Sequence, residues 1–515
     1  MNRRKRNILL ITADQWRGDT LGAVGHPVVR TPHIDALAAA GTLFRRHYAN
    51  AAPCGPSRAS LLTGLYPHNH RSIRNGTPLD ARFTNIALEA RKAGYDPVLF
   101  GYTDSSPDPR ALPPGDPRLE SYEGVLPGFT VGVRLGEDSK PWLADLKAKG
   151  YAVPGPGHAI YQPAPAGLDP SLDSSRGPTF APAIFTAQDS ETWWLTDRAI
   201  QHLSMQGEEP FFLHLSYLRP HPPFIAPEPY HALYDPDAVP APVRAGSLAA
   251  EKAQHPFLKI LLEAVRQESF FQHGDGLATD LTERDIRQLR ATYYALLSEV
   301  DANLGRLFAF LKAQGLWENT LVALTTDHGE QLGDHHLLGK QGYFEGSYHI
   351  PLILRDPDAA GGGQVDVFTE SVDVMPTLLD RLGLPIPDQC DGRSLGGFLD
   401  GEAAPADWRR AVCSLFDFRD AHEPVLQRPL GLKADQCTLM AWREERWKYV
   451  HFTALPPLLF DLEADPHELR NLAADPAYAP VALACAQRLL SWRMEHEEGT
   501  LANLQLGPGG VARVG

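Results

Sequence analysis

The chain is poor in cysteine, has no long apolar run and carries no excess of basic residues. Its five cysteines, at positions 54, 390, 413, 437 and 485 of 515, are odd in number and widely spaced, which does not suggest a disulfide framework or a zinc site. No apolar stretch approaches the length of a membrane span. The net charge of −15 argues against a nucleic-acid partner, because nothing supplies a face that neutralises phosphates.

The beginning of the chain imitates a signal peptide without completing one. A basic cluster precedes the apolar run Ile8-Leu9-Leu10-Ile11, but this run is too short for the apolar region of a signal peptide. Asp14 follows it without a cleavage-like motif. We therefore expect a cytoplasmic protein that does not associate with a membrane.

Apolar runs with the character of strands alternate with well-delimited helices. The first strand covers about residues 7–13, and a helix follows with Thr31 as its N-cap, Pro32 at its first position and Gly41 as its end. A long helix with helical periodicity begins near Thr282 and ends at Gly315. This alternation predicts an α/β layer architecture, and the length predicts at least one further unit.

The pattern changes past Gly392. Residues 411–416 and 437–452 are predicted strands, the second a hairpin that turns near Glu444-Glu445, and a helix follows over about 480–496. We predict a larger α/β domain over residues 1–400 and a smaller antiparallel α+β domain over 401–515. The tail 497–515 has no obvious core of its own, so it is either disordered or docked on another subunit.

Two segments show no regular pattern. Residues 104–183 are rich in Pro, Gly and Asp, and residues 221–280 are also irregular. Long irregular segments in a compact enzyme are often walls or lids of a site. A surface decoration is the alternative, and the sequence leaves both open.

Polar residues follow four of the predicted strands, and open α/β sheets bind ligands beyond the carboxyl ends of their strands. Carboxylates together with a carboxamide or an imidazole suit a divalent cation. We expect Asp327 and His328 to face this metal, and His335 and His336 to be supporting or structural groups. The four sets are Asp14-Gln15, Tyr102-Thr103-Asp104, His221 and Asp327-His328.

Cys54 lies in the run Pro53-Cys54-Gly55-Pro56-Ser57-Arg58, which leads into Thr63-Gly64. A single cysteine is usually a small buried apolar residue, or a nucleophile if its pKa is lowered. No cysteine-protease signature accompanies it. Pro56 suits the first turn of a helix that Gly64 ends, so residue 54 would lie beside the free N–H groups of a helix start, which favour anions.

The run C-x-P-S-R followed by T-G resembles the signature at which sulfatases have a cysteine oxidised to formylglycine. Together with Asn75 and Gly339-Lys340, five stretches resemble the sulfatase branch of the alkaline phosphatase superfamily, and within it the phosphonate monoester hydrolases and their arylsulfatase relatives. This resemblance implies a large mixed sheet sandwiched by helices, with the chemistry in residues 1–400. The five stretches are residues 14–17, 54–58, 101–103, 219–224 and 327–330.

The resemblance also implies roles for single residues. One divalent ion (Ca²⁺, Mn²⁺ or Mg²⁺) would be held by Asp14, the formylglycine made from Cys54, Asp327 and His328. Arg58 would orient the formylglycine diol and stabilise its charge, His221 would protonate the leaving oxygen, and Lys340 would offset charge during transfer. Gln15 stands where many sulfatases carry a second Asp, so it would be a weaker ligand or a substrate contact. Substrate contacts are expected from Gln15, Asn75, Tyr102 and Asp104.

We therefore predict an arylsulfatase-type enzyme that also acts on phosphonate monoesters and phosphodiesters. Asp104 and Ser57 depart from the Thr and Ala that are usual in phosphonate monoester hydrolases, which favours sulfate esters. The alternative reverses the preference, to a phosphonate monoester hydrolase and phosphodiesterase with side sulfatase activity. Two further hypotheses are an anion-binding protein without formylglycine and a phosphomonoesterase that would need a second metal.

The same resemblance implies three kinds of partner. The substrate would be a small-molecule ester, and a formylglycine-generating enzyme would act on Cys54 during maturation. The family resemblance and the tail 497–515 together predict a homodimer or homotetramer.

Overall fold

The computed structural model describes residues 5–136, 138–164, 176–207 and 209–513. The predicted segments 104–183 and 497–515 extend into residues 137, 165–175 and 514–515, which lie outside the described residues.

The main sheet has nine strands and is mixed. The strands from β7 to β5 are parallel to one another, and β8 is antiparallel to both of its neighbours. In spatial order they are β10 (Thr369–Glu370), β2 (Thr42–Tyr48), β8 (His349–Arg355), β7 (Thr320–Thr325), β1 (Asn7–Ala13), β6 (Phe212–Tyr217), β4 (Pro97–Gly101) and β5 (Thr130–Arg134), with β9 (Gly363–Val365) also paired to β2.

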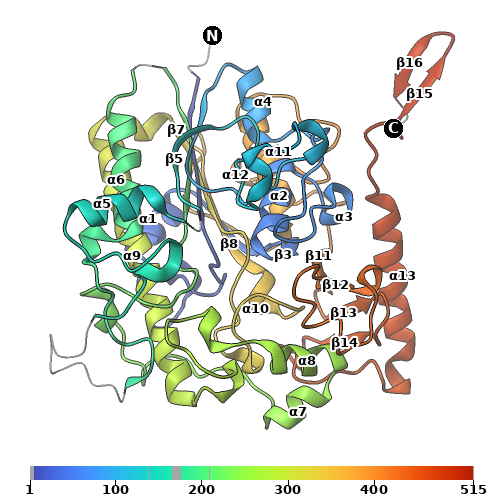
Figure 1. Cartoon of the computed structure of the whole chain (residues 1–515). Helices are drawn as coiled ribbons and strands as arrows, with labels where there is room; N and C mark the ends of the chain where they lie inside the picture. Colours follow the sequence, from blue (N-terminus) through green and yellow to red (C-terminus); the bar gives the residue numbers. More distant parts are fainter. Residues whose placement is uncertain (1–4, 137, 165–175, 208, 514–515) are drawn as a thin grey trace.

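Helices cover both faces of this sheet (Figure 1). Successive residues of a strand point to opposite faces, so in β1 Leu9 and Ile11 belong to one apolar core while Ile8 and Leu10 belong to the other. The first core is closed by α1 (Pro32–Ala40), α5 (Lys140–Ala148), α6 (Glu191–Ser204) and α9 (Glu283–Ala313). The second is closed by α2 (Cys54–Thr63), α4 (Ile86–Lys92), α11 (Val374–Arg381) and α12 (Gly396–Leu399).

Local sequence signals explain where the helices begin and end. The side chain of Thr282 caps α9 by accepting a hydrogen bond from the backbone N–H of Asp285. The side chain of Asp285 accepts one from the backbone N–H of Thr282, which completes a capping box. Gly64 follows α2 with φ of 70°, a left-handed conformation that glycine adopts without strain. The predicted strand at 7–13 and the predicted helix from Pro32 to Gly41 are confirmed.

A second sheet of five strands forms the smaller α+β unit. The helix α13 (Ala479–Glu495) packs on one of its faces and α8 (Pro256–Ala264) on the other. The predicted hairpin is confirmed, with its turn between Glu444 and Trp447. The strand order is β14 (Leu458–Asp461), β13 (Trp447–Phe452), β12 (Thr438–Glu444), β11 (Ala411–Asp417) and β3 (Ala51–Ala52).

The edge strand β3 ties this second sheet to the main one. It pairs in parallel with β11, with Ala51 opposite Leu415 and Ala52 opposite Phe416. Because β3 ends two residues before Cys54, the start of α2 is anchored by the C-terminal sheet, a link that the sequence pattern did not predict. A domain boundary near residue 400 stays a prediction.

The remaining α-helices of the described residues, apart from α13, are short: α3 (Pro67–His70), α7 (Leu248–Ala253) and α10 (Glu345–Tyr348). After α13 the chain forms a two-stranded hairpin of β15 (Leu504–Gly507) and β16 (Gly510–Arg513), which projects from the body (Figure 1). Its two strands pair with each other, and Arg513 also forms an ion pair with Asp388 at 2.5 Å. Docking of this segment on another subunit stays a prediction.

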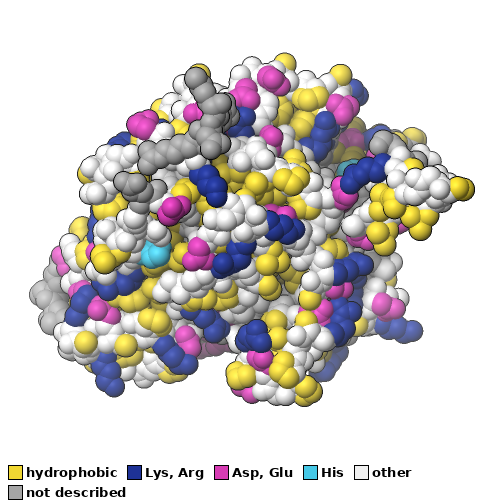
Figure 2. Space-filling view, turned by 90° about the horizontal axis from the view of Figure 1, so that it is seen from above, with side chains coloured by type: hydrophobic (Ala, Val, Ile, Leu, Met, Phe, Trp, Pro, Cys, Tyr) yellow, Lys and Arg dark blue, Asp and Glu magenta, His cyan; other side chains and the backbone are white. Residues whose placement is uncertain are grey.

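On the face seen in Figure 2, acidic and basic side chains are interspersed, so no extended field of one sign dominates this face. In the described part of the chain, no helix combines the length and the apolar character that crossing a bilayer requires.

Candidate active site

The four sets of polar residues predicted from the sequence meet at one edge of the main sheet. Strands β7, β1, β6 and β4 are adjacent and parallel, so their carboxyl ends share that edge. Asp327 and His328 follow β7, Asp14 follows β1, and Tyr102 follows β4. The strand order thus converts four distant sequence positions into one site.

Cys54 enters this site from the side. It is the first residue of α2, is 5% exposed, and lies beside the N–H groups that the start of a helix leaves free. One of these groups, the N–H of Gly55, donates to Oδ1 of Asn75 at 2.9 Å. A side chain at position 55 would come within 3.1 Å of the carbonyl of Asp104, so the glycine permits this close approach.

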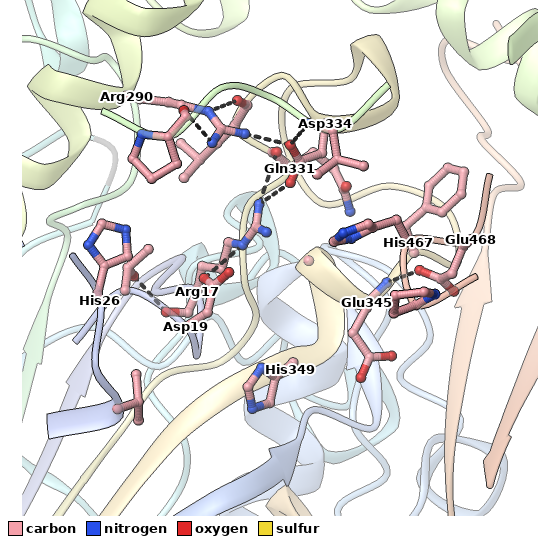
Figure 3. Close-up of a pocket in the computed structure, with 18 of the residues that line it drawn as sticks. Arg17, Asp19, His26, Arg290, Gln331, Asp334, Glu345, His349, His467 and Glu468 are labelled. Carbon is pink, nitrogen blue, oxygen red and sulfur yellow. Dashed lines mark hydrogen bonds and ion pairs between the residues drawn. The ribbon is translucent and has the colours of Figure 1, made fainter. Parts of the chain in front are cut away.

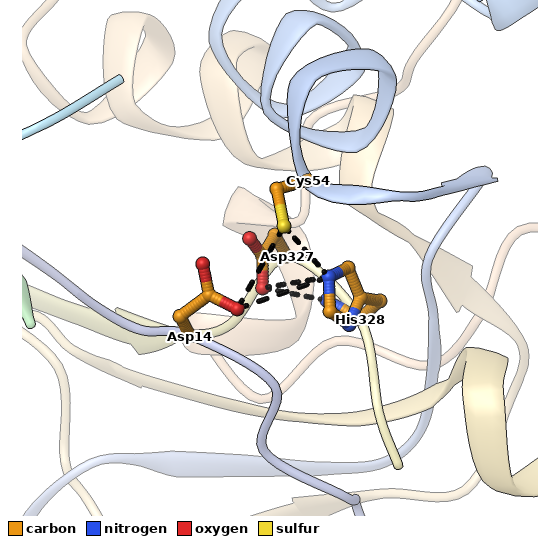
Figure 4. A group of neighbouring side chains, drawn as sticks. All are labelled: Asp14, Cys54, Asp327 and His328. Atoms are coloured by element: carbon orange, nitrogen blue, oxygen red, sulfur yellow. Dashed lines mark hydrogen bonds and ion pairs between the residues drawn. The ribbon is translucent and has the colours of Figure 1, made fainter. Parts of the chain in front are cut away.

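Four side chains point toward one another and form a candidate metal centre (Figure 4). Their ligand atoms all lie within 4.8 Å of one another, with Cys54 Sγ 3.2 Å from His328 Nε2 and 3.9 Å from Asp14 Oδ1. Such spacing accommodates one ion bound at about 2–2.5 Å by every member. Two carboxylates and an imidazole suit a hard or borderline divalent cation, so the donor set fits the predicted metal. The four are Asp14, Cys54, Asp327 and His328.

Arg58 holds the two carboxylates of this group in place. Its Nε donates to Asp327 Oδ2 at 2.9 Å and its Nη2 to Asp14 Oδ2 at 3.0 Å. Its Nη1 donates to the carbonyl of Tyr102 and to Ser216 Oγ. With 1% exposure, Arg58 lies behind the ligands, and its contacts are with them rather than with the cavity.

Charges at the site differ from those of the free side chains. Burial, and then the charge of Asp14, raises the pKa of the Cys54 thiol well above its ordinary value. Burial alone would raise the pKa of Asp14, but the cations around it, first Arg58, lower it to about 2. At neutral pH Asp14 is therefore ionised while Cys54 is a thiol, which makes an unmodified Cys54 a poor nucleophile.

Lys340 and His221 form a pair on one wall of the site. Lys340 Nζ donates to Gln15 Oε1 at 2.8 Å and lies 3.1 Å from His221 Nε2. Burial lowers the pKa of Lys340, but acidic groups, Cys54 and Asp14 first, raise it above its ordinary value. Gln15 is fully buried behind Lys340 and also donates to Glu330, so it orients the lysine.

These groups surround a cavity of about 90 Å³ at the edge of the sheet. Seven predicted site residues line it: Asp14, Cys54, Asn75, Tyr102, Asp104, His221 and Lys340. The other four, Gln15, Arg58, Asp327 and His328, are buried behind this wall. A substrate contact by Gln15 stays a prediction.

The cavity also has walls that the sequence did not identify. Tyr122, Glu123, Leu135, Gly136 and His158 come from the irregular segment 104–183, which supports its interpretation as a wall of the site. Glu191 of α6 and Leu218 complete the lining. Only the composition of that segment pointed to it, because no motif marks the individual residues.

Asp104 also lines the cavity and is 7% exposed. Burial raises its pKa to about 8, although the charge of Arg58 opposes this. Tyr102, which lines the same cavity, donates through its hydroxyl to Asp14 Oδ2 at 2.7 Å. Tyr102 therefore supports a metal ligand as well as lining the cavity.

Two residues near the loop that carries Asp327 and His328 have structural contacts. His335 donates or accepts at 2.7 Å with Glu251 and stacks on Phe344, away from the candidate metal group, as expected. Ser57, fully buried on α2, donates its hydroxyl to the carbonyl of Asp327. The serine therefore braces the loop that carries two ligands.

A larger cavity of about 600 Å³ is lined in part by the loop 330–346 (Figure 3). Several of its charged residues are paired with one another: Arg17 with Asp19 at 2.8 Å and Asp334 at 2.5 Å, and Arg290 also with Asp334. None of the four candidate metal ligands lines it. We place the chemistry in the smaller cavity, because the groups that could act on a substrate converge there.

Comparisons with known proteins agree with this geometry. The sulfatase family model matches residues 6–118 and 145–384, and a model described as N-sulphoglucosamine sulphohydrolase, C-terminal, matches residues 333–495. The chain is 44% identical to the multifunctional alkaline phosphatase superfamily protein PehA of Trinickia caryophylli, covering 98% of this chain and 99% of that protein. It is 28% identical to arylsulfatase K of Bos taurus, covering 91% and 75% of the two chains.

A solved structure is similar over the same extent. The phosphonate monoester hydrolase of Agrobacterium radiobacter superposes with a TM-score of 0.94 and 47% identity, covering 99% of each chain. The mixed sheet, its two helical layers and the smaller C-terminal domain are thus those expected from the sequence. The chain belongs to the sulfatase family of the alkaline phosphatase superfamily and is a hydrolase of ester bonds.

Proposed function

We propose that this protein is a formylglycine- and metal-dependent hydrolase of phosphonate monoesters and phosphodiesters, with side activity on sulfate monoesters. The observation that carries the proposal is the four-ligand group that includes Cys54, in a chain 47% identical to a phosphonate monoester hydrolase. The sequence favoured the reverse order of preference, through Asp104 and Ser57. The much lower identity to an arylsulfatase weighs against that order.

The charge of the site suits a monoanionic ester. Within the described residues, one group of metal-ligating side chains is found and no second one. A phosphate monoester dianion would favour a second metal ion, whereas phosphonate monoesters, phosphodiesters and sulfate monoesters each carry one negative charge at a tetrahedral centre. One bound cation together with Lys340 matches that charge.

The metal would be held by Asp14, Asp327, His328 and residue 54, and would supply a positive charge that activates the nucleophile and offsets charge on the substrate oxygens. Formylglycine at position 54 would supply the attacking oxygen through its hydrated aldehyde. Arg58 keeps both carboxylates oriented toward the metal. The donors of the Asn75 side chain amide and of Lys340 line the cavity where the anion would bind.

The pair of Lys340 and His221 supplies the proton for the leaving oxygen. Nδ1 of His221 lies 2.7 Å from the carbonyl of Pro222, so this nitrogen carries the hydrogen and Nε2 accepts from Lys340. Burial, and then the charge of Lys340, lowers the pKa of His221 well below its ordinary value. The proton is thus held by Lys340 and shared with His221, and a negatively charged leaving oxygen would draw it from this pair.

The test is kcat/KM for an aryl phosphonate and an aryl sulfate that share one leaving group. The protein should first be shown by mass to have lost about 18 Da at Cys54, the change from thiol to aldehyde. We expect the phosphonate to be the better substrate. A clear preference for the sulfate would instead restore the arylsulfatase hypothesis and give meaning to Asp104 and Ser57.

Three further proposals accompany this function. A formylglycine-generating enzyme would modify Cys54, and the protein would act in the cytoplasm on a small-molecule ester. It would assemble as a homodimer or homotetramer through its C-terminal segment. Exposed apolar side chains support that assembly: Leu483, Leu490 and Met494 on α13, and Leu501, Leu506 and Val511 in the tail.

A further inference from the structure

One wall of the substrate cavity is acidic. Asp104, Tyr122 and Glu123 form this acidic wall, whereas Lys340 and His221, which also line the cavity, are hydrogen-bonded to each other. Besides the metal ligand Asp14, the lining holds the acidic side chains of Asp104, Glu123 and Glu191. Such groups are unexpected in a cavity built for an anion, because an ionised carboxylate would repel the substrate. Their presence requires a separate explanation.

Backbone contacts fix this wall in place. The segment 121–126 is tied to the loop after β4, since Ser105 N donates to the carbonyl of Gly124 at 3.1 Å and Leu126 N donates to Thr103 Oγ1 at 2.9 Å. Thr103 Oγ1 in turn donates to the carbonyl of Gly124 at 3.0 Å. These bonds hold Tyr122 and Glu123 beside Asp104 rather than leaving them on a free loop.

The carboxylate of Glu123 packs against the backbone of Gly136, where a side chain would collide with Oε2. The wall is therefore shaped to bring this carboxylate to the cavity. Within the described residues, Asp104 accepts no hydrogen bond through its side chain. Its one ion-pair partner there, Arg58, lies 3.7 Å away and already binds two other carboxylates.

We propose that this acidic wall, Asp104 and Glu123 with the ring of Tyr122, binds an ammonium group on the substituent that stays on phosphorus. An ammonium group would donate to the oxygens of Asp104 and Glu123, and a tyrosine ring attracts cations through its face. The leaving group would lie toward Lys340 and His221, so the retained substituent would extend toward other residues of the lining, which include Asp104 and Glu123. The cavity of about 90 Å³ favours a short arm, as in a 2-aminoethylphosphonate ester.

This inference rests on the proposed function, and its test separates the two. We would compare kcat/KM at pH 7 for the 4-nitrophenyl monoesters of 2-aminoethylphosphonate and of propylphosphonate. They share the leaving group and nearly the same shape, and differ in one positive charge. We expect the ammonium ester to be favoured about 10-fold or more, the order expected for hydrogen bonds to charged groups.

The variants Glu123→Gln and Asp104→Asn should each reduce this preference, while Glu120→Gln, which removes the same charge from an exposed position nearby, should not. Circular dichroism and the thermal midpoint report whether each variant is folded, and the preference is read as the ratio of the two esters within each variant. Equal rates for the two esters in the parent protein would overturn the inference and leave the proposed function intact. A preference that survives both variants would also overturn it, whereas no turnover of either ester would contradict the proposed function itself.

Placing the ammonium group on the leaving group gives a third arm. A choline-type leaving group should show no such preference relative to its neutral isostere. If the preference appears only there, the assignment of the acidic wall to the retained substituent is wrong.

Discussion

Lys340 and His221 share one hydrogen bond, in which the ammonium donates to Nε2 of the imidazole across 3.1 Å. The direction is set by Nδ1, which lies 2.7 Å from the carbonyl of Pro222 and therefore carries the ring hydrogen. His221, the residue predicted as the general acid, is thus neutral in the free protein. The proton for the leaving oxygen is held by Lys340 and shared with His221. This arrangement explains why both residues belong to the same step.

Replacing His221 by Ala should slow esters with poor leaving groups by about 10²–10⁴-fold and esters with good leaving groups much less. A proton matters only where the leaving oxygen is too basic to depart as an anion. The measurement is the dependence of log kcat/KM on the pKa of the leaving phenol, which should become steeper. An equal loss for all phenols would count against a role in proton transfer.

The pH dependence should follow from the lowered pKa of His221. Because this pKa lies well below the ordinary value, the imidazole stays neutral as the pH falls from 8 to 6. We expect kcat/KM to show no inflection from His221 near its ordinary pKa, and activity should fall only at lower pH, when protonation breaks the bond from Lys340. An inflection near pH 6.5 that disappears in His221→Ala would contradict this assignment.

Cys54→Ala should abolish turnover, by at least about 10⁴-fold, and leave the fold intact. Alanine removes both the nucleophile and one metal ligand, but position 54 is a small buried site at a helix start. Circular dichroism and the thermal midpoint should match those of the parent protein. Retained activity in this variant would exclude formylglycine as the nucleophile.

Chelation should remove activity, and one divalent cation should restore it. With the metal gone, the carboxylates of Asp14 and Asp327 lose one of the two cations that bridge them and keep Arg58, so unfolding should also occur at a lower temperature. Titration of the chelated protein with Ca²⁺, Mn²⁺ and Mg²⁺ should reach full activity near one equivalent of the preferred ion. Full activity after exhaustive, slow chelation with no bound metal by elemental analysis would refute the metal site.

Ser57→Ala should weaken metal binding by roughly fivefold, corresponding to the loss of one hydrogen bond of about 1 kcal/mol. The lost bond is the one to the carbonyl of Asp327, which braces the ligand loop. Competition with a fluorescent chelator measures the change. Ser60→Ala, on the same helix but bonded to His70, is the matched control and should bind the metal as the parent does.

The C-terminal hairpin should be needed for assembly. Leu506 and Val511 pair across β15 and β16 and are 80% and 66% exposed, and an isolated two-stranded hairpin is marginal in water. The double variant Leu506→Glu, Val511→Glu should lower the mass found by sedimentation equilibrium without unfolding the chain. A parent protein that sediments as a monomer would remove the basis for this proposal.

Local chemistry made the larger elements and much of the site predictable. The N-cap of α9 and the glycines that follow α1, α2 and α9 appear in the sequence because they satisfy backbone groups within a few residues. Parallel strands place their carboxyl ends at one edge of the sheet, so the sequence alone predicts that residues such as Asp14 and Asp327 lie close together. The motif around Cys54 identified the candidate nucleophile because its residues are contiguous.

The tertiary structure decided what depends on contacts between distant segments. Side-chain packing in the assembled site places Arg58 against the metal ligands rather than in the cavity. The same packing lets Gln15 orient Lys340. Glu123 reaches the cavity only because segment 121–126 bonds to the loop after β4. Periodicity and capping depend on interactions between residues that are close in the sequence, so they can be predicted from it. The position of a wall made from an irregular segment depends on partners many residues away, and no local pattern predicts it.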